Sequence, residues 1–546
     1  MAGQSGEVVT LQLGDYANYV GAHWWNLQKA EFSQSLDSEF CSDVLFRRGV
    51  TLQGAETCTP RLIALDLREH VCSVREGGAL YEDGDERQCA PAWRGEVSVH
   101  TEDSSTQQEE AGIPAGVHDG GLSRTVPSPC LAQKTNWVWS DVLQTQLHPK
   151  SLCVVDGQHR GGDVDGLQSF SQGEATFRSQ LEEIEDRLHF FTEECDYLQG
   201  FQLLCDVHNG FSGVGARMVE LLHDEYPGRG ILSFGTYPVP SGRKDPCKAL
   251  YQLMNCVLAL GPFSSYSSLF CPLSVMSSLG RRPGTPTVFP QLLYDASVQY
   301  HSSAVLAVVL NTLTVPYRMS SSGLSMSHQA ETLTFGGRKV LAAACAVPFP
   351  LSSPMSLSDA LLPHRSAAPW RSVSACGGGA AIFSQSVVLR GLPEMHHNSL
   401  LPGRWPPSPL HTHESEQQVL QEYLRTLYPG TLSMTHVLRA PCTLGPTFPQ
   451  FFSPYVTKDG FTTEEPQAAP PVVGHIPVLG ALQTTSALEH MLCGLCDELS
   501  MAVVRRWMNF STAAMEQDDF REAVDDVRNL AHHYRAREGN EMEDSD

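Results

Sequence analysis

The 546-residue chain has no apolar run long enough to cross a membrane as a helix. Its most apolar stretch, Ala304 to Leu310, is far shorter than the roughly 20 residues that a span requires. The N-terminus lacks the pattern of a cleavable signal peptide, and residues 1–40 are neither Arg-rich nor acid-poor, as an organelle import presequence would be. We therefore expect no transmembrane helix, and any membrane association should be peripheral.

Basic residues are scarce in this chain. It has 37 Lys and Arg against 61 Asp and Glu, which gives a formal net charge of −24. This excess of negative charge argues against sequence-independent binding to nucleic acid and against general attraction to anionic membranes. We therefore expect protein partners and no nucleic acid.

Regularly spaced cysteines and common catalytic motifs are also missing. The 16 cysteines are scattered, many within apolar runs, which fits buried thiols in a reducing compartment better than a disulfide framework. Cys493 and Cys496 form the only C-x-x-C pair, without a second pair or suitably spaced histidines. There is no G-x-S-x-G, Walker lysine or H-E-x-x-H motif. We predict no metal site and no catalytic residue, and we interpret the histidines at 411 and 413 as solvated.

Composition and periodicity divide the chain into segments. The alternating run from Val8 to Leu13 predicts a strand, followed by a helix and a second strand before residue 75. Residues 76–134 are rich in Glu, Asp, Ser, Gln, Gly and Pro, which predicts a disordered acidic insertion. Residues 174–192 carry apolar side chains at helical spacing, which predicts one amphipathic helix.

The most informative stretch is residues 193–229, EECDYLQGFQLLCDVHNGFSGVGARMVELLHDEYPGR. It predicts a buried strand, a glycine-rich turn over residues 209–215, and an amphipathic helix. Such a unit points backbone N–H groups and the positive end of a helix at a phosphate. A glycine-rich turn alone is weak evidence, because most are only turns.

The text of this stretch resembles the tubulin superfamily, in which CDCLQGFQL-type text runs into GGGTGSG and then a helix ending in EEYP. Four further segments resemble tubulin segments in the same order: residues 7–28, 60–75, 338–350 and 515–534. They look like the first strand and loop, the second strand and loop, the opening of the second domain and the last helix. The double Trp24-Trp25 and the unusual glycine turn favour the Misato family, tubulin-related proteins tied to mitochondrial distribution and morphology.

The resemblance implies an α/β fold of the tubulin type. This fold has a Rossmann-like parallel sheet with helices on both faces, a bridging helix, a smaller α+β domain and C-terminal helices. We expect a nucleotide-binding-type domain over 1–300, a bridging helix and loop over 301–336, and a second domain with Ser/Pro/Gly-rich loops over 337–480. C-terminal helices should follow over 481–538, and then a short acidic tail over 539–546.

Tubulins hold a guanine nucleotide with several loops, and the resemblance implies that this chain keeps only part of that site. Asp15 replaces a Gln that would face phosphate and magnesium, Arg68 replaces an acidic residue, and Gln252 stands where an Asn would read guanine. Asn209 and Phe211 replace two glycines of the phosphate loop. The candidate residues of this degenerate site are Gly14, Asn18, Asp66, Ser212, Gly213, Gly215 and Tyr294, the last as a ring that could stack on a base.

Hydrolysis in polymerising relatives needs an N-x-D loop, and the matching stretch here, HQAETLTFGG, has neither Asn nor Asp. We therefore expect no GTP hydrolysis by the tubulin mechanism and no required cofactor, with GTP binding left open. The resemblance implies a non-enzymatic regulator of mitochondrial distribution and morphology, cytoplasmic and peripheral at the mitochondrial outer membrane. Its partners would be tubulin or outer-membrane proteins. The alternatives are a GTP-binding switch and a tubulin-assembly or filament factor.

Overall fold

The computed structural model describes residues 6–34, 39–50, 54, 56–71, 138–155, 167–240, 245–280, 284–320, 324–352, 355–377, 381–393, 408–467, 471–499 and 517–535. The acidic insertion expected at 76–134 and the acidic tail expected at 539–546 lie outside these residues. Within the described part of the chain, no helix is both long enough and apolar enough to span a membrane.

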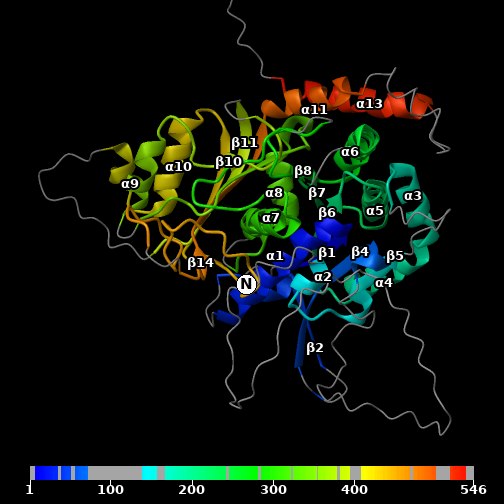
Figure 1. Cartoon of the computed structure of the whole chain (residues 1–546), viewed down its shortest axis with the longest axis horizontal. Helices are drawn as coiled ribbons and strands as arrows, with labels where there is room; N and C mark the ends of the chain where they lie inside the picture. Colours follow the sequence, from blue (N-terminus) through cyan, green and yellow to red (C-terminus); the bar gives the residue numbers. More distant parts are fainter. Residues whose placement is uncertain are drawn as a thin grey trace, which may run out of the picture. The chain divides into compact units, whose positions relative to one another are not determined.

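A six-stranded parallel sheet forms the centre of the N-terminal part of the chain (Figure 1). The strand order is β5-β4-β1-β6-β7-β8, and every neighbouring pair is parallel. The bounds are β1 Glu7–Leu13, β4 Leu62–Leu67, β5 Leu152–Val155, β6 Leu198–Asp206, β7 Gly230–Thr236 and β8 Leu269–Leu273. Because parallel strands end at one edge, the turns after β1, β4 and β6 lie next to one another.

Helices cover both faces of this sheet, as the fold prediction requires (Figure 1). The helices α1 and α7 lie together on one face, and α3, α5 and α6 lie on the other. The bounds are α1 Asp15–Gln34, α2 Trp139–Val142, α3 Phe170–Ser179, α4 Leu181–Glu193, α5 Phe211–Glu225, α6 Pro246–Tyr266, α7 Gln299–Leu313 and α8 Met326–Leu333. The predicted bridging helix corresponds to α7, which is buried from Ser302 to Leu313 and contacts α1 as well as β11 and β15 of a second sheet.

The single helix predicted over residues 174–192 is wrong, because two helices, α3 and α4, meet at Gln180. Gln180 leaves the helical conformation (φ −112°, ψ 9°), and its side-chain amide donates to the carbonyl of Val154 in β5. The apolar spacing survives the break, since Phe177, Ile184 and Leu188 are all buried. Periodicity therefore identified the buried face but not the kink.

The second sheet is mixed and has the strand order β10-β9-β15-β11-β12. Its bounds are β9 Ala342–Ala346, β10 Arg371–Ser372, β11 Ile382–Arg390, β12 Leu432–Leu438 and β15 Val478–Thr485, with α9 Leu357–Leu361 and α10 Glu416–Leu427 beside it. Residues 481–485, expected among the C-terminal helices, belong instead to β15. This strand is central and buried, and it pairs with β9 on one side and β11 on the other.

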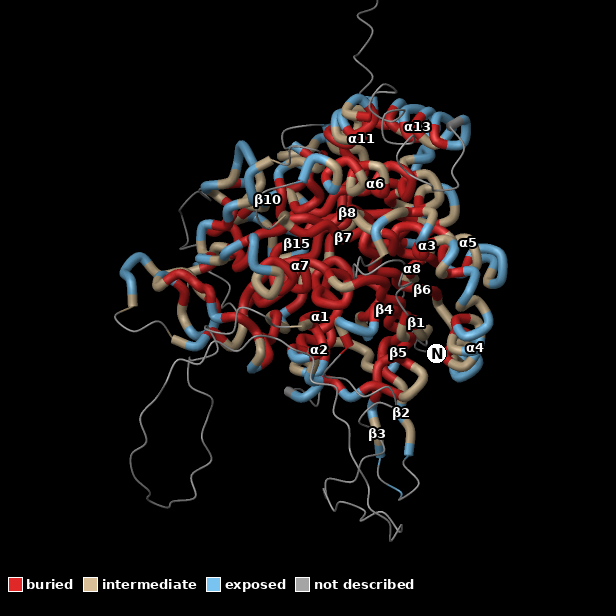
Figure 2. The backbone as a smooth tube through the Cα atoms, turned by 45° about the vertical axis from the view of Figure 1, so that its right-hand side comes forward, coloured by how far each residue is buried: buried red, intermediate tan, exposed pale blue. Residues whose placement is uncertain are grey.

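The C-terminal helices are α11, Ala487–Asp497, and α13, Gln517–His532. The last helix has one apolar stripe, which is buried against α6 and α11 (Figure 2). Its members are Phe520, Val524, Val527, Ala531 and Tyr534. Two small antiparallel ribbons complete the structure: β2 Phe46–Val50 with β3 Glu56–Pro60, and β13 Cys442–Thr443 with β14 His475–Ile476.

Candidate nucleotide-type site

The candidate site lies at the carboxyl edge of the first sheet, where the turns after β1, β4 and β6 meet. Gly14 and Asn18 come from the β1–α1 turn and the first turns of α1, and Asp66 lies near the end of β4. The Asn18 amide donates to Asp66 Oδ2 at 3.0 Å and to the carbonyl of Leu65 at 3.2 Å. The structure therefore brings these three predicted residues together, and all three are buried.

The N-terminus of α1 is occupied by a carboxylate of the chain itself. Asp206, the last residue of β6, is fully buried. Its Oδ2 accepts from the backbone N–H of Tyr16 at 3.1 Å, and its Oδ1 accepts from that of Ala17 at 2.9 Å. The hydroxyl of Thr236 and the amide of Asn209 also donate to it, at 2.8 and 3.2 Å. Helix N-termini attract anions, and here the anion is a side chain.

The contact between Asp206 and the N-terminus of α1 explains why residue 14 is a glycine. Its φ is +103°, a conformation that favours glycine. A Cβ at this position would lie 2.6 Å from Asp206 Oδ2, closer than ordinary van der Waals contact. The glycine therefore makes the turn and lets the Asp206 carboxylate reach the helix.

The second helix N-terminus at the site, that of α5, is also satisfied internally. The Asn209 side-chain oxygen accepts from Phe211 N at 2.9 Å, and the Asn209 carbonyl accepts from Ser212 N at 3.1 Å. The carbonyl of Gly210 accepts from the next two N–H groups, at 3.0 and 3.4 Å. The glycine-rich turn predicted over 209–215 is therefore shorter, because this capping lets the helix begin at Phe211.

The glycines of this segment serve the packing of α5 against α3 and the sheet. A Cβ on Gly213 would overlap the carbonyl oxygen of Phe170 in α3, and a Cβ on Gly173 of α3 would overlap that of Gly210. A Cβ on Gly215 would lie 2.5 Å from the sulfur of Cys205. Ser212 is buried, and its hydroxyl donates to the Asn209 carbonyl at 2.7 Å. Ser212, Gly213 and Gly215, which are predicted to contact a phosphate, thus make close contacts within the protein instead.

Two tyrosines lie near the site in different roles. Tyr294, the predicted base-stacking residue, is half-buried; its hydroxyl donates to the carbonyl of Thr287 at 2.6 Å, and its ring contacts Phe289 and Phe451. Its role towards a base stays a prediction. Tyr16, which sequence reasoning missed, is fully buried, and its hydroxyl donates to Ser302 Oγ of α7 at 3.0 Å. Its ring fills space between α1 and α7.

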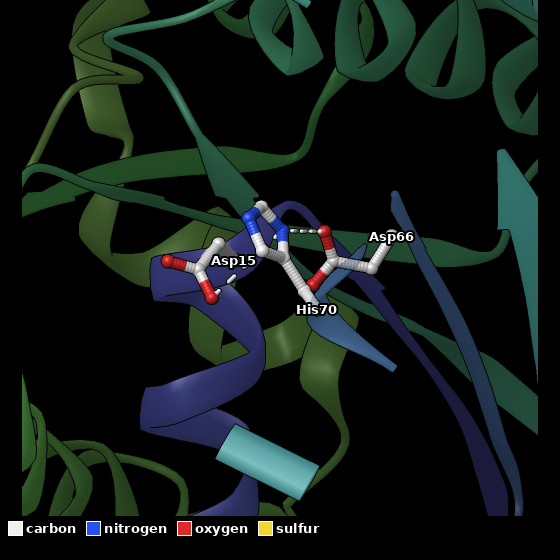
Figure 3. Close-up of side chains that lie close together, drawn as sticks. All are labelled: Asp15, Asp66 and His70. Carbon is white, nitrogen blue, oxygen red and sulfur yellow. Dashed lines mark hydrogen bonds and ion pairs between the residues drawn. The ribbon is translucent and has the colours of Figure 1, made fainter. Parts of the chain in front are cut away.

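Beside the Asp206 contact, three side chains form a charged cluster (Figure 3). His70, at the end of the 3₁₀ turn η2 (Arg68–His70), points towards Asp66 on one side and Asp15 on the other. Its Nδ1 lies 2.8 Å from Asp66 Oδ1 and 4.0 Å from Asp15 Oδ1. The ligand atoms of the three residues all lie within 4.8 Å of one another, so they could hold a metal ion by distance alone.

The hydrogen bonds of Asp66 argue for an ion pair at this cluster instead of a metal. Besides His70, its carboxylate accepts from Leu67 N at 2.8 Å, Trp139 Nε1 at 2.8 Å and Asn18 Nδ2 at 3.0 Å. A carboxylate offers about four acceptor positions, so all are in use. A metal ion at Asp66 would have to displace one of these donors, and the donor set fits a metal poorly.

The surroundings shift the pKa of His70, Asp15 and Asp206. Burial lowers the pKa of His70, but the hydrogen bond to Asp66 and the charges of Asp66 and Asp15 outweigh it and raise the value to about 9. Burial raises the pKa of Asp15 to about 6. Burial also raises that of Asp206 to about 7, against the hydrogen bonds from Thr236 and Tyr16, which lower it. His70 is therefore an imidazolium at neutral pH.

We expect the stability that His70 contributes to be lost at alkaline pH. Its pKa is raised from 6.5 to about 9, so the contribution is complete below pH 6.5 and disappears as the pH rises through 9. With 28% of the side chain exposed, solvent screening leaves a contribution of about 2 kcal/mol. Urea unfolding at pH 6.5 and pH 9.5 should show this loss in the wild type but not in His70→Gln. The exposed His328→Gln serves as control, and equal losses in wild type and His70→Gln would contradict the assignment.

Comparison with known proteins shows to which family the chain belongs. Residues 6–111 match the Misato Segment II tubulin-like domain, and residues 128–319 match the Tubulin domain. The chain is 45% identical over 551 residues to Protein misato homolog 1 of Mus musculus, covering 98% of this chain and 99% of that protein. The chain belongs to the Misato family. It is 43% identical over 569 residues to Protein misato homolog 1 of Homo sapiens, with 98% and 99% covered, and 28% identical over 557 residues to Protein misato of Drosophila melanogaster, with 95% and 97% covered.

Misato family membership confirms the resemblance and the tubulin-like α/β fold inferred from the sequence. The sequence did not identify three side chains that decide the chemistry of the site: Tyr16, His70 and Asp206. For Asp206 a signal was present, since a carboxylate ends a buried strand just before a glycine-rich turn. In a phosphate site that position would place negative charge beside the ligand.

Proposed function

We propose that this Misato family member is a non-enzymatic, tubulin-like protein that acts through protein contacts and holds no nucleotide. The observation that carries the proposal is the Asp206 carboxylate on the N-terminus of α1. The capping of α5 by Asn209 supports it, because all four N–H groups from Phe211 to Val214 donate to acceptors within the chain.

The turn that would position water for hydrolysis also supports a non-enzymatic protein. It is the 3₁₀ turn Phe335–Gly337, where Gly336 and Gly337 have φ values of +73° and +79°. The nearest preceding carboxylate, Glu331, lies on the exposed side of α8. Without a carboxylate at the turn, the tubulin mechanism has no group there to orient water.

We further propose, from the family resemblance, a role in mitochondrial distribution and morphology. The protein would be cytoplasmic and would associate peripherally with the mitochondrial outer membrane through protein partners. The high negative charge of the chain is consistent with attachment through a partner, since anionic lipids would repel it.

A tubulin-assembly or filament factor is the second candidate. It is favoured by Phe335, which is 77% exposed on the turn that in polymerising relatives reaches the neighbouring subunit. Pelleting with and without tubulin tests this candidate: co-pelleting that is lost in Phe335→Ser would support it, and indifference to tubulin would remove it.

The main proposal predicts protein purified without guanine nucleotide. Denatured protein, run on anion exchange, should release far less than one nucleotide per chain, and GTP with Mg²⁺ should leave the melting temperature unchanged. A ligand at 100 times its Kd would stabilise the folded state by about 2.7 kcal/mol, a clear melting shift. One guanine nucleotide per chain would reject the proposal and favour a GTP-binding switch.

A further inference from the structure

We propose that Asp206 is a built-in anion that excludes phosphate ligands from this site, with protonated His70 as the matching built-in cation. The inference rests on the proposed function and adds the residues that would keep a nucleotide out of the site. The chain then supplies both charges that a nucleotide and its metal would otherwise bring.

The position of Asp206 is specified by three separate parts of the structure. Backbone N–H groups of α1, the Thr236 hydroxyl of β7 and the Asn209 amide of the β6–α5 turn all donate to its carboxylate. Asp206 and Thr236 are fully buried. A phosphate could reach the N–H groups of Tyr16 and Ala17 only by displacing this carboxyl group. Above pH 7, where Asp206 is ionised, the phosphate would then meet a buried negative charge.

Neighbouring groups strengthen the exclusion. Gly14 leaves room for the carboxylate, and Tyr16 fixes the first turn of α1 to Ser302 of α7. Asp15 and Asp66 add two more carboxylates to the same edge, and His70 lies between them as the compensating cation (Figure 3). An incoming phosphate would therefore face three carboxylates and a single imidazolium already paired with Asp66.

The test is Asp206→Ser, which removes the charge and shortens the side chain. Wild type, Asp206→Ser and the control Asp245→Ser, an exposed helix cap on α6, are each melted with GTP·Mg²⁺ and with inorganic phosphate at pH 8, where Asp206 is ionised and His70 is still protonated. We expect Asp206→Ser alone to gain saturable binding to at least one probe, at least tenfold tighter than wild type. If Asp206→Ser folds but binds neither probe, this inference is overturned, while the proposed function is unaffected. Wild type that binds GTP overturns both.

A measurement on the wild type covers the case in which Asp206→Ser does not fold. In amide NMR spectra, the signals of Tyr16 and Ala17 should not move when inorganic phosphate is added, because Asp206 holds both groups. Saturable movement of these two signals would overturn the role of Asp206. The imidazole signals of His70 should titrate well above the ordinary histidine range, and an ordinary value would overturn its role as the cation.

Discussion

Arg390→Met is expected to lower the free energy of unfolding by about 3–5 kcal/mol, because it leaves a buried carboxylate without its cation. Arg390 in β11 is fully buried, and 8% of the Glu31 side chain is exposed. The two groups lie 2.7 Å apart, and the same guanidinium nitrogen of Arg390 donates to the carbonyl of Pro441 at 2.9 Å. The methionine would fill the space but could not neutralise Glu31.

The ion pair belongs to a network that joins α1 and α7 to β11 of the second sheet. Glu31 lies on α1, and its Oε1 also accepts from the Asn311 amide of the bridging helix α7 at 2.8 Å. Asn311 Oδ1 in turn accepts from Arg318 at 2.8 Å and from Gln28 of α1. A broken pair therefore disturbs the contact among α1, α7 and β11, and not one side chain alone.

Denaturant unfolding at pH 7 measures the effect, and a double variant tests its cause. Replacing both partners, as Glu31→Leu with Arg390→Met, should recover much of the loss, since no charge is then buried alone. Glu422→Gln is the matched control, because its partner Arg425 is 76% exposed, and it should cost less than about 1 kcal/mol. A double variant no more stable than Arg390→Met would show that the loss comes from packing, not from the unpaired charge.

The sequence predicts elements well where local periodicity determines them. The strands β1 and β6 and the helices α5, α7 and α13 all fall on predicted segments. It fails where tertiary contacts decide, as at Gln180, whose helix break is held by a carbonyl of β5. The same holds for the end of β15, where pairing with β9 as far as Gln483 and with β11 as far as Thr485 extends the strand.

The residues of the candidate site likewise divide into those that the sequence predicts and those whose roles depend on tertiary contacts. Gly14, Asn18 and Asp66 are assigned to one site through the resemblance to the tubulin loops, and the structure brings them together. Asp206 could not be assigned its role, since the N–H groups that it binds lie 189 and 190 positions away in the chain. A pattern of residue types does not state which donors a buried carboxylate will find.

A glycine in a sequence does not show which group approaches its backbone, and Gly213 is the clearest example. Its replacement gives the second large predicted effect on stability. Gly213→Ala is expected to destabilise the protein by about 3 kcal/mol or more, because the added methyl group would overlap the Phe170 carbonyl and force α3 away from α5. Gly494→Ala in α11 is the matched control: outside its own helix nothing lies within 4 Å of its Cβ position, so it should stabilise the helix by about 0.5–1 kcal/mol.

Thermal and urea unfolding of both variants distinguish two roles for the glycine at position 213, close packing against α3 and close approach of a phosphate. If Gly213 serves packing, as the α3 contact indicates, Gly213→Ala loses stability whether or not GTP·Mg²⁺ is present. If it served the approach of a phosphate, the alanine would leave the empty protein nearly unchanged and would remove only the stabilisation by ligand. A Gly213→Ala variant as stable as wild type would contradict the packing role. A glycine in a sequence indicates that something comes close to the backbone, and here the group that comes close is a carbonyl of the same chain.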